Sequence, residues 1–262
     1  MFILLGLFIL LFNDGSPASA EAISLPIAAH VQQQIEARRG IWMGLTANLT
    51  LQFNEKGHSA SCQGRLTYDR IKEKVTLDCY NLKKELLFSY QTLDQNFEVY
   101  LSSQNKVIRG DIFELQYDPD THIQLRPLDL YRALKPILIE GTQTRVTDWS
   151  EDSLRLNVIK NKDPGPGNYI SRSLLVTKKG DVIEETFYTP KEEPSIKITR
   201  RDFSEHKMKD LNRKVPYPKI TEILSLEEDR KTTLIIREIK LYLHPQEWPA
   251  KRFPETIPVE TL

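Results

Sequence analysis

The chain has 262 residues, and its 36 basic side chains (Lys and Arg) balance its 36 acidic ones (Asp and Glu) to a formal net charge of zero. A neutral chain has no global electrostatic attraction to nucleic acid or to an anionic membrane surface, so neither partner is expected. The charged fraction of 27% excludes disorder of the whole chain, and the length allows one or two domains with a sizeable core.

The first twenty residues carry the features of an export signal. The apolar run Phe2 to Phe12 has the length of a signal-peptide hydrophobic region and is shorter than the roughly 20 residues that span a bilayer. Ala18-Ser19-Ala20 matches the A-x-A cleavage pattern, although no Lys or Arg precedes the apolar run. We expect export, cleavage near residue 20 and a soluble mature protein from about Glu21. The alternatives are a mistaken start site and an uncleaved anchor.

A short helix is predicted over residues 24–39, with a capping serine, a proline in its first turn and a glycine after its end. Ile27, Val31 and Ile35 recur every four residues and therefore line one side of this helix. We expect the stripe to be an ordinary packing face, rather than a ligand site, and to pack on the sheet that starts immediately afterwards.

A meander of antiparallel strands is predicted from Ile41 to Leu101. Residues 43–53 alternate strictly between apolar and polar, which is typical of a half-buried strand. The apolar residues of this first strand are Leu45, Ala47, Leu49, Leu51 and Phe53.

The next two strands contain the only two cysteines. A hairpin in which Leu66 faces Val75 places apolar residues on one face of both strands and sets Cys62 opposite Cys79. Because export permits disulfides, we expect these cysteines to be bonded; the alternative is two buried thiols. A metal site is not expected, since the pair lacks further ligands at usable spacing.

Strand signals stop near Ile108, where Arg109-Gly110-Asp111 has the composition of a turn. A second helix is predicted over residues 126–139, and Pro136 should kink it or end it early because proline lacks a backbone donor. Its apolar stripe includes Leu130, Leu134 and Ile137.

Strand patterns resume at residue 142 and continue to residue 243, separated by turns rich in Gly and Pro. Residues 202–218 are expected to form a long, polar and mobile connection. The proline-bearing tail from His244 is expected to form neither regular helix nor interior strand. No shift in composition divides the chain, so a single domain is expected over residues 21–262.

About a dozen strands with two short helices indicate a mainly β fold, in which one strongly curved antiparallel sheet, or unclosed β-barrel, holds the helices on its concave side. A curved sheet lined by Leu, Ile, Phe and Tyr and loosely filled by helices encloses an apolar cavity. Such a cavity suits lipid chains.

The order of these features resembles a known family. An export signal and a short helix precede the segments Ile41–Phe53 and Gly64–Arg70, and the meander ends at Tyr100–Val107. This layout resembles the LolA/LolB-like lipoprotein carriers of the bacterial periplasm. The resemblance implies an unclosed β-barrel of about eleven strands with a short-helix lid, periplasmic localisation, and binding of the acyl chains of lipoproteins or other lipids bound for the outer membrane. It also implies an inner-membrane donor and an outer-membrane acceptor as possible partners.

The resemblance further implies a role for Arg70. In the carrier branch of the family, an arginine after the second strand holds the lid through hydrogen bonds, and Arg70 stands at the matching place; the alternative is a solvated turn charge. Ile71 replaces the proline that usually follows this arginine, and the acylated cysteine of the membrane-anchored branch is absent. The cysteine pair and the polar segment 202–218 also depart from the family pattern.

We expect the acyl chains to contact the apolar face of the sheet and the lid. The alternative is that the same side chains form a filled, dry core in a structural or interaction module of the cell envelope. The candidate lipid-binding residues are Leu45, Leu49, Leu51, Phe53, Leu66, Leu77, Phe88, Phe97, Val99, Leu101, Leu130 and Leu134.

Enzyme motifs are not found. The sequence has no G-x-S-x-G, no H-E-x-x-H and no phosphate-binding glycine loop. Gly165-Pro166-Gly167 reads as a turn, because Pro166 lacks the N–H that a phosphate loop donates. We therefore expect neither catalysis nor a cofactor.

Overall fold

The fold is known from a computed structural model. It describes residues 29–35, 37, 42–93, 96–112, 127–134, 137, 143–150, 152–161, 167–209, 211–226, 229–244, 246, 248, 253 and 258–261. The predicted export signal lies outside the described residues.

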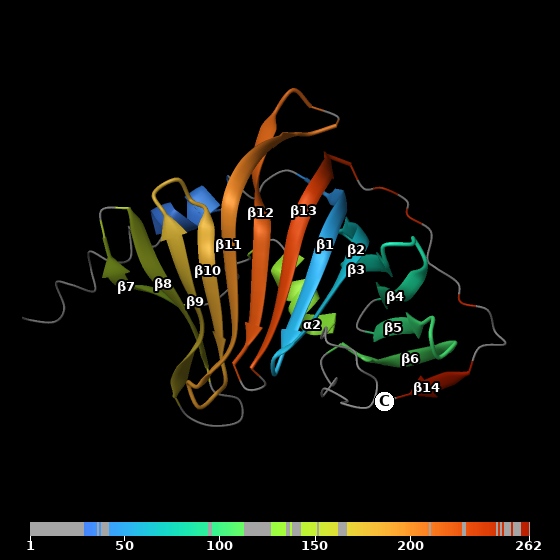
Figure 1. The fold of residues 1–262 in the computed structure, drawn as a ribbon. Helices are drawn as coiled ribbons and strands as arrows, with labels where there is room; N and C mark the ends of the chain where they lie inside the picture. The colour runs from blue at the N-terminus through green and yellow to red at the C-terminus, as the bar shows by residue number, and fades with distance from the viewer. Residues whose placement is uncertain are drawn as a thin grey trace, which may run out of the picture.

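One strongly curved, open sheet contains all the strands of the described residues (Figure 1). Thirteen strands pair antiparallel, and a short fourteenth pairs parallel to β6 at one edge, so the mainly β, unclosed sheet is confirmed, although the expected number of about eleven strands was too low. The spatial order is β14-β6-β5-β4-β3-β2-β1-β13-β12-β11-β10-β9-β8-β7. The strands are β1 (Gly44–Glu55), β2 (His58–Asp69), β3 (Lys74–Tyr80), β4 (Leu86–Leu93), β5 (Asn96–Leu101), β6 (Lys106–Asp111), β7 (Gln143–Trp149), β8 (Ser153–Asn161), β9 (Asn168–Thr177), β10 (Val182–Tyr188), β11 (Pro194–Lys207), β12 (Lys214–Ser225), β13 (Arg230–Tyr242) and β14 (Val259–Thr261).

The alternation predicted for β1 is confirmed, since all five of its apolar residues are buried on the concave face while Asn48 and Gln52 are exposed. Irregular pairing bends this face at several places, for example between Asn48 and Leu49 on the β13 side and between Phe187 and Tyr188 on the β11 side. Because a β-bulge kinks its strand and increases the local twist, these irregularities favour a curved sheet over a flat one.

The predicted register between β2 and β3 is wrong by two residues. Leu66 pairs with Leu77 rather than with Val75, and Gly64 pairs with Cys79. The turn between the strands is longer than a tight hairpin turn: the Asp69 carboxylate accepts hydrogen bonds from the amides of Ile71 and Lys72 (3.0 and 3.1 Å). Because side chains alternate with a period of two, an even shift keeps every residue on its predicted face.

The segment Arg109–Asp111, predicted as a turn, belongs to β6. Gly110 lies opposite Phe97, and the Arg109 guanidinium donates to the carboxylate of Glu98 on β5 at 2.6 Å. Composition alone favoured a turn, whereas pairing with β5 supplies this segment with backbone partners and an ion pair across the strands.

The long connection expected over residues 202–218 is also wrong, because β11 and β12 continue as a hairpin through most of it. Asp202, with φ of 57°, lies between the pairs Arg201–Ile220 and Phe203–Pro218, and the register is unchanged across it. β12 pairs with β13 only from Ile220 onward, so its first half forms a two-stranded ribbon with much of its surface exposed. In this half of β12, Val215 and Tyr217 are buried and alternate with exposed or half-buried residues, whereas the facing part of β11 is largely exposed. The free side of β12 tolerates the prolines.

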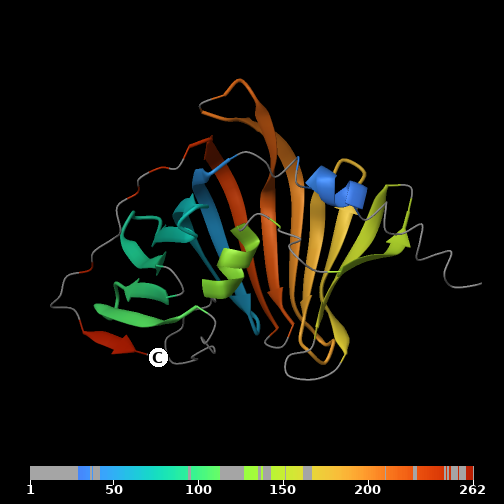
Figure 2. The ribbon, with the colours of Figure 1, turned by 180° about the vertical axis from the view of Figure 1, so that it is seen from behind.

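Helices occupy the concave side of the sheet (Figure 2). Residues 29–35 are helical, as predicted, and α2 (Pro127–Leu134) lies within the second predicted helix and ends two residues before Pro136.

Two separate apolar clusters result. The larger joins α2 to the concave face of β1–β6 and β11–β13, and the smaller joins Val31 and Ile35 to β8, β9 and β10. The N-terminal helical segment therefore packs on the far half of the sheet rather than on the strand that follows it, because α2 covers the apolar face of β1.

Candidate ligand-binding site

A cavity of about 100 Å³ lies where the two apolar clusters meet, between the helical segments and the concave face. A cavity of this size accommodates a few water molecules, and we expect a long acyl chain to enter when the helical segments shift. The lining residues are Ile35, Trp42, Ala133, Leu134, Ile137, Gly180, Asp181, Val182, Arg200, Phe203, Pro216, Tyr217 and Pro218.

The twelve predicted lipid-binding residues lie together in the larger apolar cluster or against it. Eleven are buried in the larger apolar cluster, and Phe88 is partly buried against it. Only Leu134 among them lines the cavity as it stands. Lipid binding by these residues stays a prediction. The other residues of the cavity wall come from the helical segments, from residues next to strands, and from β10, β11 and β12, which the alternation in the first half of the chain does not involve.

Aromatic rings form the part of the cavity wall next to β1. Trp42 meets Tyr68 and Tyr217 edge to face, with ring centroids 5.8 and 6.2 Å apart. Burial, followed by the nearby Glu73 charge, raises the pKa of Tyr68. Burial also raises the pKa of Tyr217 to about 12. Both phenols therefore stay protonated at neutral pH and remain hydrogen-bond donors.

Helix α2 is attached to the sheet on two sides by polar contacts. The Tyr131 hydroxyl donates to the Glu73 carboxylate in the β2–β3 turn, and burial together with this hydrogen bond raises the pKa of Tyr131. The guanidinium of Arg132, the next residue, lies 4.5 Å from the centre of the Phe187 ring on β10. Neighbouring residues of α2 thus connect two distant parts of the sheet across its concave side.

Arg70, the predicted lid tether, lies in the same β2–β3 turn as Glu73. Its amide donates to the carbonyl of Met43 (2.9 Å), and its charge lowers the pKa of Tyr68 against the stronger effect of burial. Glu73, in the same turn, contacts α2 through the Tyr131 hydroxyl. The sequence therefore pointed to the β2–β3 turn that contacts α2, whereas the lid-holding role of Arg70 itself stays a prediction.

A buried ionic cluster that sequence reasoning missed lies on the concave face of β9, β10 and β11. The two carboxylate oxygens of Glu185 accept separately from Arg172 Nη1 (3.0 Å) and Arg200 Nη2 (2.9 Å). The side chains of Glu185 and Arg200 are only 2% and 6% exposed. A signal was present, because Arg200 continues the apolar alternation of Ile196 and Ile198 and so had to point inward.

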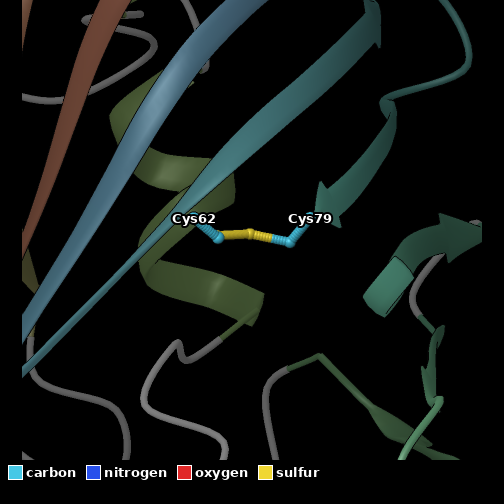
Figure 3. Close-up of a disulfide and its surroundings, with 2 residues drawn as sticks. All are labelled: Cys62 and Cys79. Atoms are coloured by element: carbon cyan, nitrogen blue, oxygen red, sulfur yellow. A yellow bond between two sulfur atoms is a disulfide. The ribbon is translucent and has the colours of Figure 1, made fainter. Parts of the chain in front are cut away.

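The disulfide between Cys62 and Cys79 is present, with the Cα atoms 5.7 Å apart (Figure 3). The two residues are diagonal rather than directly opposed, since Gly64 is the partner of Cys79 in the β2–β3 register. Both cysteines are buried in the larger apolar cluster. The bond therefore ties two strands together beneath the surface that α2 covers.

Two features are absent from the residues that the structure describes. No group of three or more His, Cys, Asp or Glu side chains there is placed to hold a metal ion. No helix in that part of the chain is long and apolar enough to cross a membrane.

Comparison with known proteins supports the architecture. No family model and no curated protein sequence matches the chain. Among solved structures, a domain assigned to outer membrane lipoprotein sorting from Vibrio parahaemolyticus matches with a TM-score of 0.58 at 13% identity, covering 84% of this chain and 93% of that one. A LolA superfamily protein from Nitrosomonas europaea matches with a TM-score of 0.56 at 11% identity, covering 85% and 94%. This chain has a LolA-like fold.

A third match extends the LolA-like comparison. A DUF1329 family protein from Desulfovibrio piger has a TM-score of 0.58 at 10% identity and covers 83% of this chain and 93% of its own. The fold expected from the resemblance is therefore confirmed over most of the chain. Identities this low concern the arrangement of the backbone alone.

Proposed function

We propose that the protein is a non-enzymatic carrier that is exported to the periplasm and binds the acyl chains of lipoproteins or other lipids between its curved sheet and its helices. The observation that carries this proposal is an apolar cavity covered by α2 in a LolA-like fold. The Vibrio match, a protein assigned to lipoprotein sorting, supports the same cargo class. An inner-membrane donor and an outer-membrane acceptor are proposed as partners.

Acyl chains would enlarge the cavity by displacing α2 from the apolar face. The chains would then contact the predicted residues of the sheet together with Leu130 and Leu134 of the lid. Each buried methylene contributes about 0.8 kcal/mol, so two or three acyl chains supply micromolar or tighter binding after the cost of association. When the cargo leaves, an open lid would expose the apolar face of the sheet to water. The hydrophobic effect therefore favours closure of the lid over this face.

Binding is tested by displacement of a fluorescent fatty-acid analogue from the mature protein by a triacylated lipopeptide. We expect binding of the analogue at micromolar concentration and its displacement by the lipopeptide. A folded mature protein that binds neither compound at that concentration would contradict the carrier function.

A filled core in a structural or interaction module of the cell envelope is the second candidate. Its support is that eleven of the twelve predicted residues are buried against other side chains and the cavity is small. Mass spectrometry of an organic extract of the purified protein separates the two functions, because a carrier is expected to retain lipid from the cell.

The contact between Tyr131 and Glu73 predicts the behaviour of the lid. Tyr131→Phe removes the hydroxyl that donates to the carboxylate, so we expect bound analogue to leave roughly ten to a hundred times faster, as for the loss of one hydrogen bond to a charged group. If Arg70 also holds the lid, Arg70→Leu should change the release rate in the same direction. Stopped-flow dilution measures both rates.

Tyr100→Phe is the matched control for this prediction. The Tyr100 hydroxyl donates to Asn105 in the exposed β5–β6 turn and has no described contact with α2. We expect its release rate to equal that of the wild type. Equal rates for Tyr131→Phe and Tyr100→Phe would show that α2 does not control release.

A further inference from the structure

We propose that Arg200 is an anion-binding group at the wall of the cavity and that it receives the carboxylate or phosphate head group of an acyl lipid. This inference rests on the proposed carrier function and narrows its cargo to lipids with an anionic head group. Three observations support it: the Arg200 side chain is buried, one of its nitrogens lacks a hydrogen-bond partner among the described residues, and the side chain lines the cavity.

The position of Arg200 follows from β11. It is in phase with Ile196 and Ile198, so its side chain points into the concave side, where it is 6% exposed and lines the cavity. Nη2 donates to Glu185, whereas Nη1 is fully buried and has no hydrogen-bond partner among the described residues. A buried guanidinium nitrogen without an acceptor is costly, because it has lost water and gained nothing in return.

The carboxylate beside Arg200 is bonded to Nη2 and not to Nη1. Each of the two oxygens of Glu185 already accepts from one arginine, Arg172 at 3.0 Å and Arg200 at 2.9 Å. The three side chains carry two positive charges and one negative charge, and the Asp181 carboxylate, which lines the same cavity, offsets the remaining positive charge. An incoming anion would accept from Nη1 once the groups that cover this buried nitrogen move aside.

The surroundings of Arg200 fit an amphiphile better than a small polar anion. Ala133, Leu134, Ile137 and Val182 line the same cavity and offer only apolar surface. The Tyr217 side chain also lines it and offers a neutral hydroxyl donor. A head group at Arg200 would therefore leave its acyl chain against apolar residues of the lid and sheet. A planar guanidinium suits both carboxylate and phosphate oxygens.

Isothermal titration calorimetry of the mature protein with dodecanoic acid, dodecyl phosphate and dodecanol tests the inference, since the three probes share one chain length. We expect at least one anionic probe to bind the wild type on the order of tenfold more tightly than dodecanol. Tighter binding of dodecanoic acid would indicate a fatty acid as the source of the head group. Tighter binding of dodecyl phosphate would indicate a phospholipid.

Arg200→Gln is expected to remove this preference while leaving the affinity for dodecanol within about twofold. Arg201→Gln is the matched control, because Arg201 is the next residue, 54% exposed and paired with Glu222 at 3.4 Å on the convex face. This control should keep the wild-type preference. If Arg200→Gln does not fold, Arg200→Lys retains the charge beside Glu185 but lacks the planar fork, and we expect it to reduce the preference.

Each outcome decides a different question. Equal binding of acid, phosphate and alcohol by the wild type overturns the role of Arg200 and leaves the carrier function standing. A preference that survives in a folded Arg200 variant also overturns it. Failure of all three probes to bind contradicts the carrier function itself.

Discussion

Glu185→Gln is expected to destabilise the folded protein by about 3–5 kcal/mol, the range found when one partner of a buried ion pair is removed. Glu185 is the carboxylate that both Arg172 and Arg200 contact, and its side chain is 2% exposed. Glutamine keeps the size of the side chain but loses the negative charge. Two guanidinium groups then lie near each other on the apolar face with no charge between them.

Urea denaturation followed by circular dichroism measures this change in the free energy of unfolding. Glu184→Gln is the control, since Glu184 points to the other face of β10 and makes ion pairs with Arg155 (3.5 Å) and Lys197 (2.7 Å), which are 33% and 39% exposed. We expect it to cost less than about 1 kcal/mol, as is usual for pairs near the surface. Equal losses for the two variants would mean that burial does not amplify the effect of Glu185.

Replacing both Cys62 and Cys79 with alanine is expected to lower the free energy of unfolding by about 3 kcal/mol. The bond joins residues 17 apart in the chain, and the value follows from the loop-closure entropy that the bond removes from the unfolded state. Both side chains are buried in the larger apolar cluster, so alanine introduces no buried polar group there.

Thermal denaturation with and without reductant checks this prediction. The wild type should lose stability when reduced, while the double alanine variant should be insensitive to reductant. Labelling of the unreduced wild type, unfolded in denaturant, with a thiol reagent should find no free thiol. Two reactive thiols in that sample, or identical melting of wild type and variant, would contradict the prediction.

Local sequence patterns were sufficient to predict which side of a single strand or helix is buried. Alternation placed Leu45, Leu49 and Leu51 on the buried face of β1, and periodicity placed Val31 and Ile35 on the buried side of a helix. These patterns hold because the side-chain direction repeats every two residues in a strand and every 3.6 in a helix, whatever the rest of the chain does. The class of fold and the cysteine pair followed from the same kind of evidence.

The tertiary structure decided what depends on partners distant in sequence. The four-residue turn set the β2–β3 register, pairing across the sheet turned Arg109–Asp111 into a strand, and β11 supported a ribbon through residues 202–218. Composition gave the wrong prediction for Arg109–Asp111 and for residues 202–218. The reason is that backbone hydrogen bonds to a neighbouring strand do not depend on side-chain hydrophobicity.

The candidate site was the least accessible from the sequence. Its wall contains Ile35, Trp42, Leu134 and Tyr217, which are far apart in the chain. These residues come together only when β1 pairs with β13. The inward direction of Arg200 could be read from its own strand. Its neighbours Arg172 and Glu185 could not, because the sequence of a strand determines which face a side chain takes, whereas the order of strands in the sheet determines which charges meet there.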